Sequence, residues 1–210
     1  CLSVHIGSQI LSNEPYKKMI RVVNSFLEKV SVNFEYIDFG GGMGIDYGST
    51  KKTFDFKKLA LEINKFSKRN ECKIILEPGR SIIGDTAVLI SKVIYIKENQ
   101  NKDFIILDAG MNDLIRPALY NAKHMIIPAN KSSKKSKKEY DFVGPICETS
   151  DRFLKMKKFQ KLNEGDIVIL KDVGAYGYVL SSNYNVRPMP KEVLVDKSKT
   201  QIISKKQSIK

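Results

Sequence analysis

The first 80 residues alternate short apolar runs with amphipathic stretches. Apolar residues at helical spacing predict helices over 14–30 and 55–69. Continuous apolar runs predict short strands over 2–6, 36–39 and 73–76. An order of strand, helix, strand, helix, strand predicts a parallel sheet or barrel with right-handed crossovers.

After about residue 85 the hydrophobic pattern changes. The helical periodicity nearly vanishes, and a long β-branched run over 88–96 predicts a strand. Further short strand-like runs follow at 104–107, 125–127, 140–143, 167–170 and 193–195. We therefore expect an α/β region over 1–85 and a mostly antiparallel β-barrel or sandwich domain over 86–210. A complete (β/α)8 barrel takes about 250 residues, so the first region would be only part of one.

Composition narrows the class of protein. The 210 residues are 42% hydrophobic and 28% charged, as in a soluble globular protein. We expect no membrane span, because no run of about 18 apolar residues occurs. Three widely spaced cysteines form no disulfide framework or metal knuckle, so we expect no metal and a reducing, cytoplasmic location. The chain begins at Cys1 without a signal-peptide pattern, which suggests processing or a longer parent chain.

The net charge of +13 raises the question of nucleic-acid binding. The one dense basic run, KSSKKSKK at 131–138, contains no aromatic residue and lies between two predicted strands. We favour a solvated loop and expect no nucleic-acid partner. Arginine is scarce beside lysine, so the arginines in motif-like stretches suggest a planar, bidentate grip on carboxylate or phosphate. These are Arg80, Arg116, Arg152 and Arg187.

Polar and glycine-rich segments follow three successive predicted strands, where α/β proteins place their active sites. They are His5-Ile-Gly-Ser-Gln9, Gly40-Gly-Gly-Met-Gly44 and Glu77-Pro-Gly-Arg80. Each has an ordinary structural explanation as well: a core histidine, a tight turn and a salt bridge. Consecutive glycines also suit a phosphate cradle, and the three segments together favour a binding site.

The segment GPICETSD, 144–151, places Cys147 beside Glu148 after a predicted strand. A thiol can donate a proton near neutral pH. Taken alone, such a pair is more often structural.

Six motifs in order resemble diaminopimelate decarboxylases, which are pyridoxal-phosphate decarboxylases with an alanine-racemase-like barrel and a β domain. The motifs are HIGSQ, FGGGMG, EPGRS, DAGMNDLIRPALY, GPICETSD and GAYGYVLSSNYN, and the resemblance extends from His5 to Val195. It implies pyridoxal 5'-phosphate as cofactor and conversion of meso-diaminopimelate to L-lysine and CO2, the last step of lysine biosynthesis. It also implies a homodimer with shared active sites, in which the β domain reaches the neighbour's site.

The resemblance assigns a role to each matching residue. Cofactor contacts fall on His5, Ser8, Gly42, Glu77, Gly79, Arg80 and Tyr176. Substrate contacts fall on Arg80, Arg116, Tyr120, Glu148 and Tyr176. Cys147 would be the catalytic proton donor.

One expected motif does not occur. Enzymes of this kind hold the cofactor through a lysine in a Tyr-Ala-x-Lys-Ala-Asn-like segment early in the barrel, and the sequence contains no such segment. We therefore expect a C-terminal part of the enzyme, inactive by itself. Two alternatives stay open: an ornithine- or arginine-type decarboxylase of the same fold, and a non-catalytic binding module. Arg80 and Arg116 favour diaminopimelate over ornithine, which has no distal carboxylate to bind.

Overall fold

A computed structural model describes residues 1–48, 53–204 and 207 of the chain. The chain divides into two compact units, Cys1–Asp85 and Thr86–Lys210. Each unit has its own hydrophobic core.

The first unit contains a three-stranded parallel sheet in the order β1-β2-β3. Its strands are β1 (Leu2–Ser3), β2 (Tyr36–Asp38) and β3 (Lys73–Ile75), and its helices are α1 (Glu14–Leu27), α2 (Phe56–Asn70) and α3 (Arg80–Ile83). The predicted order of strands and helices is confirmed. The first strand is shorter than expected, although the Val4 amide still donates to the Asp38 carbonyl at 2.8 Å.

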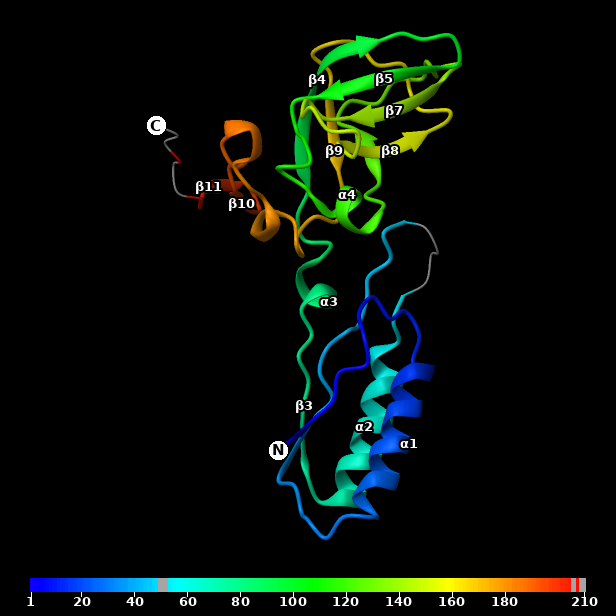
Figure 1. Ribbon diagram of the computed structural model, residues 1–210, viewed down its shortest axis with the longest axis vertical. Helices are drawn as coiled ribbons and strands as arrows, with labels where there is room; N and C mark the ends of the chain where they lie inside the picture. The colour runs from blue at the N-terminus through cyan, green and yellow to red at the C-terminus, as the bar shows by residue number, and fades with distance from the viewer. Residues whose placement is uncertain (49–52, 205–206, 208–210) are drawn as a thin grey trace. The chain divides into compact units, whose positions relative to one another are not determined.

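Helices α1 and α2 lie side by side (Figure 1). Asp55 caps α2 by accepting a hydrogen bond from the Lys58 amide at 3.0 Å, which satisfies one of the free donors of the first turn. A buried cluster joins the two helices to the sheet, and its largest fully buried members are Tyr16, Ile37, Phe39 and Phe66.

A second apolar face of α1 stays open. Val22 is 61% exposed and Phe26 is 44% exposed, although the helical repeat placed both with the buried residues. Together with Leu2, Val4 and Ile6 they line an apolar groove of about 500 Å³. The helical spacing of apolar residues in α1 therefore predicted a wider buried face than the first unit covers.

The second unit is built on a six-stranded sheet in the order β6-β9-β4-β5-β7-β8. Its strands are β4 (Leu89–Lys97), β5 (Lys102–Leu107), β6 (Ile126–Pro128), β7 (Glu139–Val143), β8 (Arg152–Met156) and β9 (Ile167–Leu170). All neighbouring pairs are antiparallel except β5 and β7. The α/β start and the mostly antiparallel β-barrel that follows confirm the expected fold class.

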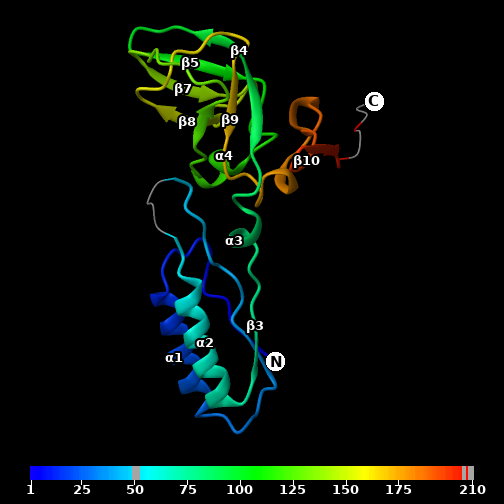
Figure 2. The same ribbon diagram turned by 180° about the vertical axis from the view of Figure 1, so that it is seen from behind.

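The long strand β4 gives this sheet its curvature. Its first half pairs with β9 and its second half with β5, with a register shift between Val93 and Tyr95. In Figure 2 it runs beside β9 before it reaches β5. The curled sheet encloses a core in which Phe142 contacts Phe159 edge to face at 5.2 Å between ring centroids.

Several short elements were not predicted. They are α3, α4 (Arg116–Tyr120), β8, β11 (Lys199–Ile202) and two single 3-10 turns, Tyr178–Leu180 and Tyr184–Val186. Strand β8 contains only three apolar residues, Phe153, Leu154 and Met156, interrupted by Lys155, and β11 is exposed throughout, so neither shows a clear apolar run. The strand β10 (Val193–Asp196), which pairs with β11, was expected.

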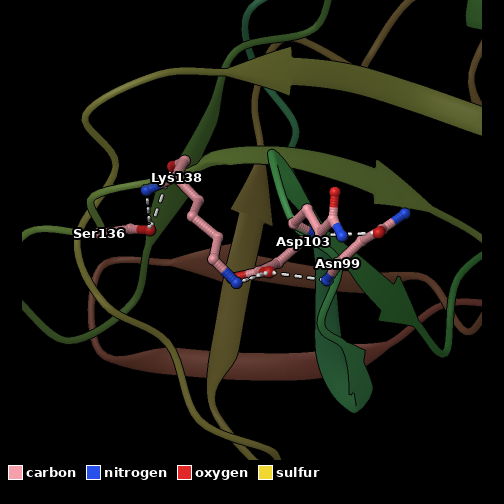
Figure 3. A network of polar contacts seen from close by, with 5 residues as sticks. Asn99, Asp103, Ser136 and Lys138 are labelled. Atoms are coloured by element: carbon pink, nitrogen blue, oxygen red, sulfur yellow. Dashed lines mark hydrogen bonds and ion pairs between the residues drawn. The ribbon is translucent and has the colours of Figure 1, made fainter.

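The basic run 131–138 is mostly exposed, and its residues lie between β6 and β7. Its end is anchored (Figure 3): Lys138 Nζ lies 3.0 Å from Asp103 Oδ1, and the Lys138 amide donates to Ser136 Oγ at 3.2 Å. Asp103 also accepts from the Asn99 amide at 3.3 Å, so the segment is tied to the turn before β5. These contacts fit the expected solvated loop.

In the part of the chain that the structure describes, no helix is long and apolar enough to cross a bilayer.

Candidate active site

The three segments that follow β1, β2 and β3 pack closely at one edge of the sheet. A Cβ atom on Gly41 would lie 2.2 Å from the Glu77 carbonyl oxygen, and one on Gly42 would lie 2.2 Å from the Gly7 carbonyl oxygen. Gly42 also has a φ of +97°, which L side chains rarely adopt. Only glycine allows the central loop to sit this close to both neighbours.

Backbone hydrogen bonds join the loop after β2 to the loops on either side of it. The Glu77 amide donates to the Gly40 carbonyl at 2.9 Å, and the Ile10 amide donates to the Gly42 carbonyl at 2.9 Å. His5 is exposed, so it is not the buried core histidine that the sequence left open.

Arg80 begins α3 and connects two of the loops. Its Nη2 donates to Ser8 Oγ at 3.4 Å, and its Nη1 donates to the Tyr47 hydroxyl at 2.7 Å. Gly79 caps the same turn, and its carbonyl accepts from the Ile82 amide at 3.0 Å. The structure therefore gathers at one edge the residues assigned to the cofactor in this unit: His5, Ser8, Gly42, Glu77, Gly79 and Arg80.

In the second unit, Asp151 organises the GPICETSD loop. Its Oδ2 accepts from the Ile146 amide and its Oδ1 from the Met111 amide, both at 2.7 Å. Asp151 is 3% exposed, and burial raises the pKa of this carboxyl, against the hydrogen bonds that lower it. A Cβ on Gly144 would meet this carboxylate at 2.3 Å. One buried side chain thus ties the loop to the DAGMND segment.

The loop presents Cys147 and Glu148 to solvent. Cys147 is a free, exposed cysteine. Glu148 Oε1 accepts a hydrogen bond from the Tyr184 hydroxyl at 2.5 Å. This hydrogen bond, followed by the charge of Glu148, raises the pKa of Tyr184. The arrangement offers a proton donor beside an oriented anion.

Arg116 lies in α4, which packs against β8, the strand that follows the GPICETSD loop. It is 5% exposed, and its Nη1 lies 2.8 Å from His124 Nε2. A guanidinium can only donate, so Nε2 accepts and the neutral ring carries its hydrogen on Nδ1. Nδ1 then donates to the Lys171 carbonyl at 2.9 Å.

The two tyrosines assigned to ligands are both exposed. Tyr120 ends α4 and is 64% exposed. Tyr176 follows β9 in a left-handed conformation with a φ of +59°, which is uncommon outside glycine.

Sequence reasoning did not single out Asp151, His124 or Tyr184. Asp151 and Tyr184 lie inside quoted motifs, but nothing in a motif shows which of its members point inward. His124 could have been noticed as one of only two histidines in the chain.

The donor set at the edge of the first unit suits a phosphorylated pyridine cofactor. Arg80 supplies a fixed cation, Ser8 a hydroxyl and the glycine loops closely approaching backbone amides, all of which bind phosphate. Glu77 supplies the carboxylate that a protonated ring nitrogen requires. In the described residues, no group of three metal-binding side chains occurs.

Comparison with known proteins gives the class. Residues 16–174 match the family model described as "Pyridoxal-dependent decarboxylase, C-terminal sheet domain". The chain belongs to this family of pyridoxal-dependent decarboxylases.

Within the family, several of the similar relatives are diaminopimelate decarboxylases. The one from Aquifex aeolicus is 42% identical over 207 residues, which are 97% of this chain and 49% of the relative. The solved enzyme from M. jannaschii in co-complex with L-lysine has a TM-score of 0.91 and 34% identity, and the match covers 99% of this chain and 49% of that one. The enzyme from Helicobacter pylori complexed with L-lysine has a TM-score of 0.84 and 38% identity, covering 99% and 52%.

These comparisons confirm the expected resemblance. The chain spans about half the length of the curated relatives that it matches.

Proposed function

We propose that this chain contributes to the pyridoxal-phosphate-dependent decarboxylation of meso-diaminopimelate to L-lysine and CO2. The observation that carries the proposal is the exposed Cys147–Glu148 pair, on a loop that the buried Asp151 holds in place. A structural cysteine would be expected to lie in a core, as the buried Cys72 does.

In this proposal the edge of the first unit binds the cofactor. Ser8, Gly42, Gly79 and Arg80 hold its phosphate, and Tyr176 of the second unit adds a hydroxyl. His5 stacks on the ring, and Glu77 keeps the ring nitrogen protonated. When bound, the cofactor supplies the electron sink that decarboxylation needs.

The substrate carries an amino-acid centre at each end, and the proposed contacts complement the end that does not react. Arg80, Arg116 and Tyr120 bind the distal carboxylate, and Glu148 binds the distal ammonium. Cys147 donates the proton that replaces the lost carboxylate on the reacting carbon.

We assign residues 1–85 to part of the cofactor-binding barrel and residues 86–210 to the β domain. The proposed assembly is a homodimer in which the β domain of one subunit completes the site of the other, in the cytoplasm. The L-lysine bound to the two solved relatives supports a site shaped for this product.

The test uses two proteins. One is the 210-residue chain, and the other is this chain fused behind the first half of the Aquifex aeolicus relative. Both are loaded with pyridoxal phosphate, and CO2 release is measured from meso-diaminopimelate, ornithine and arginine. We expect turnover of diaminopimelate by the fusion and none by the chain alone, since its sequence contains no Schiff-base lysine motif. Preferential turnover of ornithine or arginine would instead establish the alternative decarboxylase, and no turnover by the fusion would contradict the proposal.

A further inference from the structure

The turn Tyr184–Arg187 has a strained backbone that burial does not explain. Asn185 and Val186 have φ values of +55° and +58°, two consecutive left-handed residues without a glycine. For a β-branched residue this conformation is rare, because Cβ crowds the backbone. Val186 is 74% exposed, so the turn gains no apolar burial there.

Both ends of the turn are held by motifs of the second unit. The Tyr184 hydroxyl donates to Glu148 Oε1 at 2.5 Å, and Arg187 Nη2 donates to the Asp108 carbonyl. Asn183 Nδ2 donates to the Arg187 carbonyl at 2.8 Å and closes the turn. What the strained conformation achieves is the placement of these two side chains, and strain of this kind gathers at functional sites.

Glu148 needs such a constraint. It is exposed on its loop, and a glutamate side chain has three rotatable torsions. The phenol fixes one carboxylate oxygen and leaves the other to accept from a second donor, since an ionised carboxylate only accepts hydrogen bonds.

We propose that Tyr184 is a positioning residue, whose hydroxyl holds Glu148 in the orientation that accepts the distal ammonium group of a diamino-acid substrate. The role of Glu148 in this inference rests on the proposed function. The turn at Asn185 and Val186 is the device that brings the hydroxyl to the carboxylate.

The contact itself is tested on the 210-residue chain without cofactor or substrate. Tyrosine labelled with 13C at Cζ is titrated by NMR in the wild type and in Glu148→Gln, and the signal of Tyr95, which is exposed on β4, serves as the internal reference. The hydrogen bond and charge of Glu148 raise the pKa of Tyr184, so its midpoint should fall in the variant. An unchanged Tyr184 midpoint overturns the inference, whatever the protein's activity.

The positioning role of Tyr184 is tested by steady-state kinetics of the fusion protein described above, loaded with pyridoxal phosphate. Tyr184→Phe removes only the hydroxyl, and Tyr95→Phe is the matched control. We expect KM for diaminopimelate to rise about tenfold in Tyr184→Phe, the effect of one hydrogen bond to a charged group, with kcat within about twofold. The control should match the wild type.

The variant Glu148→Gln distinguishes a failure of the inference about Tyr184 from a failure of the proposed role of Glu148. If it raises KM and Tyr184→Phe does not, the inference fails while the proposed role of Glu148 stands. If neither variant changes KM, the proposed role of Glu148 fails and takes the inference with it. In the double variant, a KM no higher than that of Glu148→Gln alone supports the inference, because the hydroxyl then acts only through the carboxylate.

Discussion

At the scale of single residues, the chemistry depends on side chains that the motifs contain and on others that position them. Cys147 and Glu148 are exposed, whereas Asp151, which holds their loop, is 3% exposed. His124 is 1% exposed and lies 2.8 Å from Arg116, which is itself only 5% exposed. The exposed pair Cys147 and Glu148 is thus supported by a buried carboxylate, whereas Arg116 is buried together with its partner.

The proton-donor role predicts a specific kinetic defect. In the decarboxylating fusion, Cys147→Ser should lower kcat by about 100-fold, because a hydroxyl is a much weaker acid than a thiol, with little change in KM. Steady-state CO2 release measures both constants. Cys1→Ser, which alters another exposed free cysteine, is the matched control and should be silent. Equal kcat in Cys147→Ser and wild type would remove Cys147 from the reaction.

Asp113 predicts a pH dependence of stability. It is 8% exposed, and burial raises its pKa in the folded chain. Its contribution to stability is therefore fully present below the unfolded pKa of about 4 and is lost as pH rises through the folded value. Urea unfolding at pH 5 and pH 7 should show a smaller loss of stability at the higher pH in Asp113→Asn than in wild type. Asp196 is exposed, so Asp196→Asn should lose as much stability between pH 5 and pH 7 as the wild type. An equal loss in all three proteins would contradict the expectation.

At the scale of elements, close approach of loops matters as much as the helices and strands. The loop after β2 meets its neighbours at Gly41 and Gly42, with no room for a side chain. The sequence correctly indicated a special turn there but could not show that carbonyl oxygens of two other loops lie against it.

Replacing Gly42 tests this packing. Gly42→Ala should cost about 3 kcal/mol of unfolding free energy, since it combines left-handed strain with a clash against the Gly7 carbonyl. Gly165→Ala is the control: Gly165 has a φ of +89° but nothing within 4 Å of a Cβ, so we expect only the strain, about 1 kcal/mol. Denaturant melts measure both, and equal losses would show that the close approach contributes nothing.

A buried ion-pair cluster on β7 should contribute more to stability than an exposed ion pair. Asp141 is fully buried, and it lies 3.1 Å from both Lys102 Nζ and Arg152 Nε. Asp141→Ala should destabilise the chain by about 3 kcal/mol because it leaves both cations without their shared anion. Glu35→Ala, which breaks an exposed pair with Lys73, should cost less than about 1 kcal/mol. Thermal or urea unfolding that ranks the two variants the other way would contradict this.

Most elements could be predicted from the sequence, because the apolar runs of buried strands and the repeats of α1 and α2 are local signals. Strand β8 and helix α4 could not, because their stability comes from neighbours rather than from their own patterns. The same holds for the site. The motifs identified Cys147 and Glu148, but the contact of Tyr184 with Glu148 joins residues 36 positions apart and appears only in the fold.

At the scale of the whole molecule, the chain contains two compact units that carry different parts of the proposed chemistry. The first holds the proposed cofactor contacts, which follow a parallel sheet, and the second holds the thiol, the carboxylate and most of the proposed substrate contacts. The match to the pyridoxal-dependent decarboxylase family covers residues of both units.

The formation of L-lysine from meso-diaminopimelate tests the central claim most directly. It is measured with the fusion to the first half of the Aquifex aeolicus relative, loaded with pyridoxal phosphate, beside the 210-residue chain alone. The account predicts L-lysine and CO2 in equal amounts from the fusion and none from the chain alone. A folded, cofactor-loaded fusion that leaves diaminopimelate unchanged would contradict it.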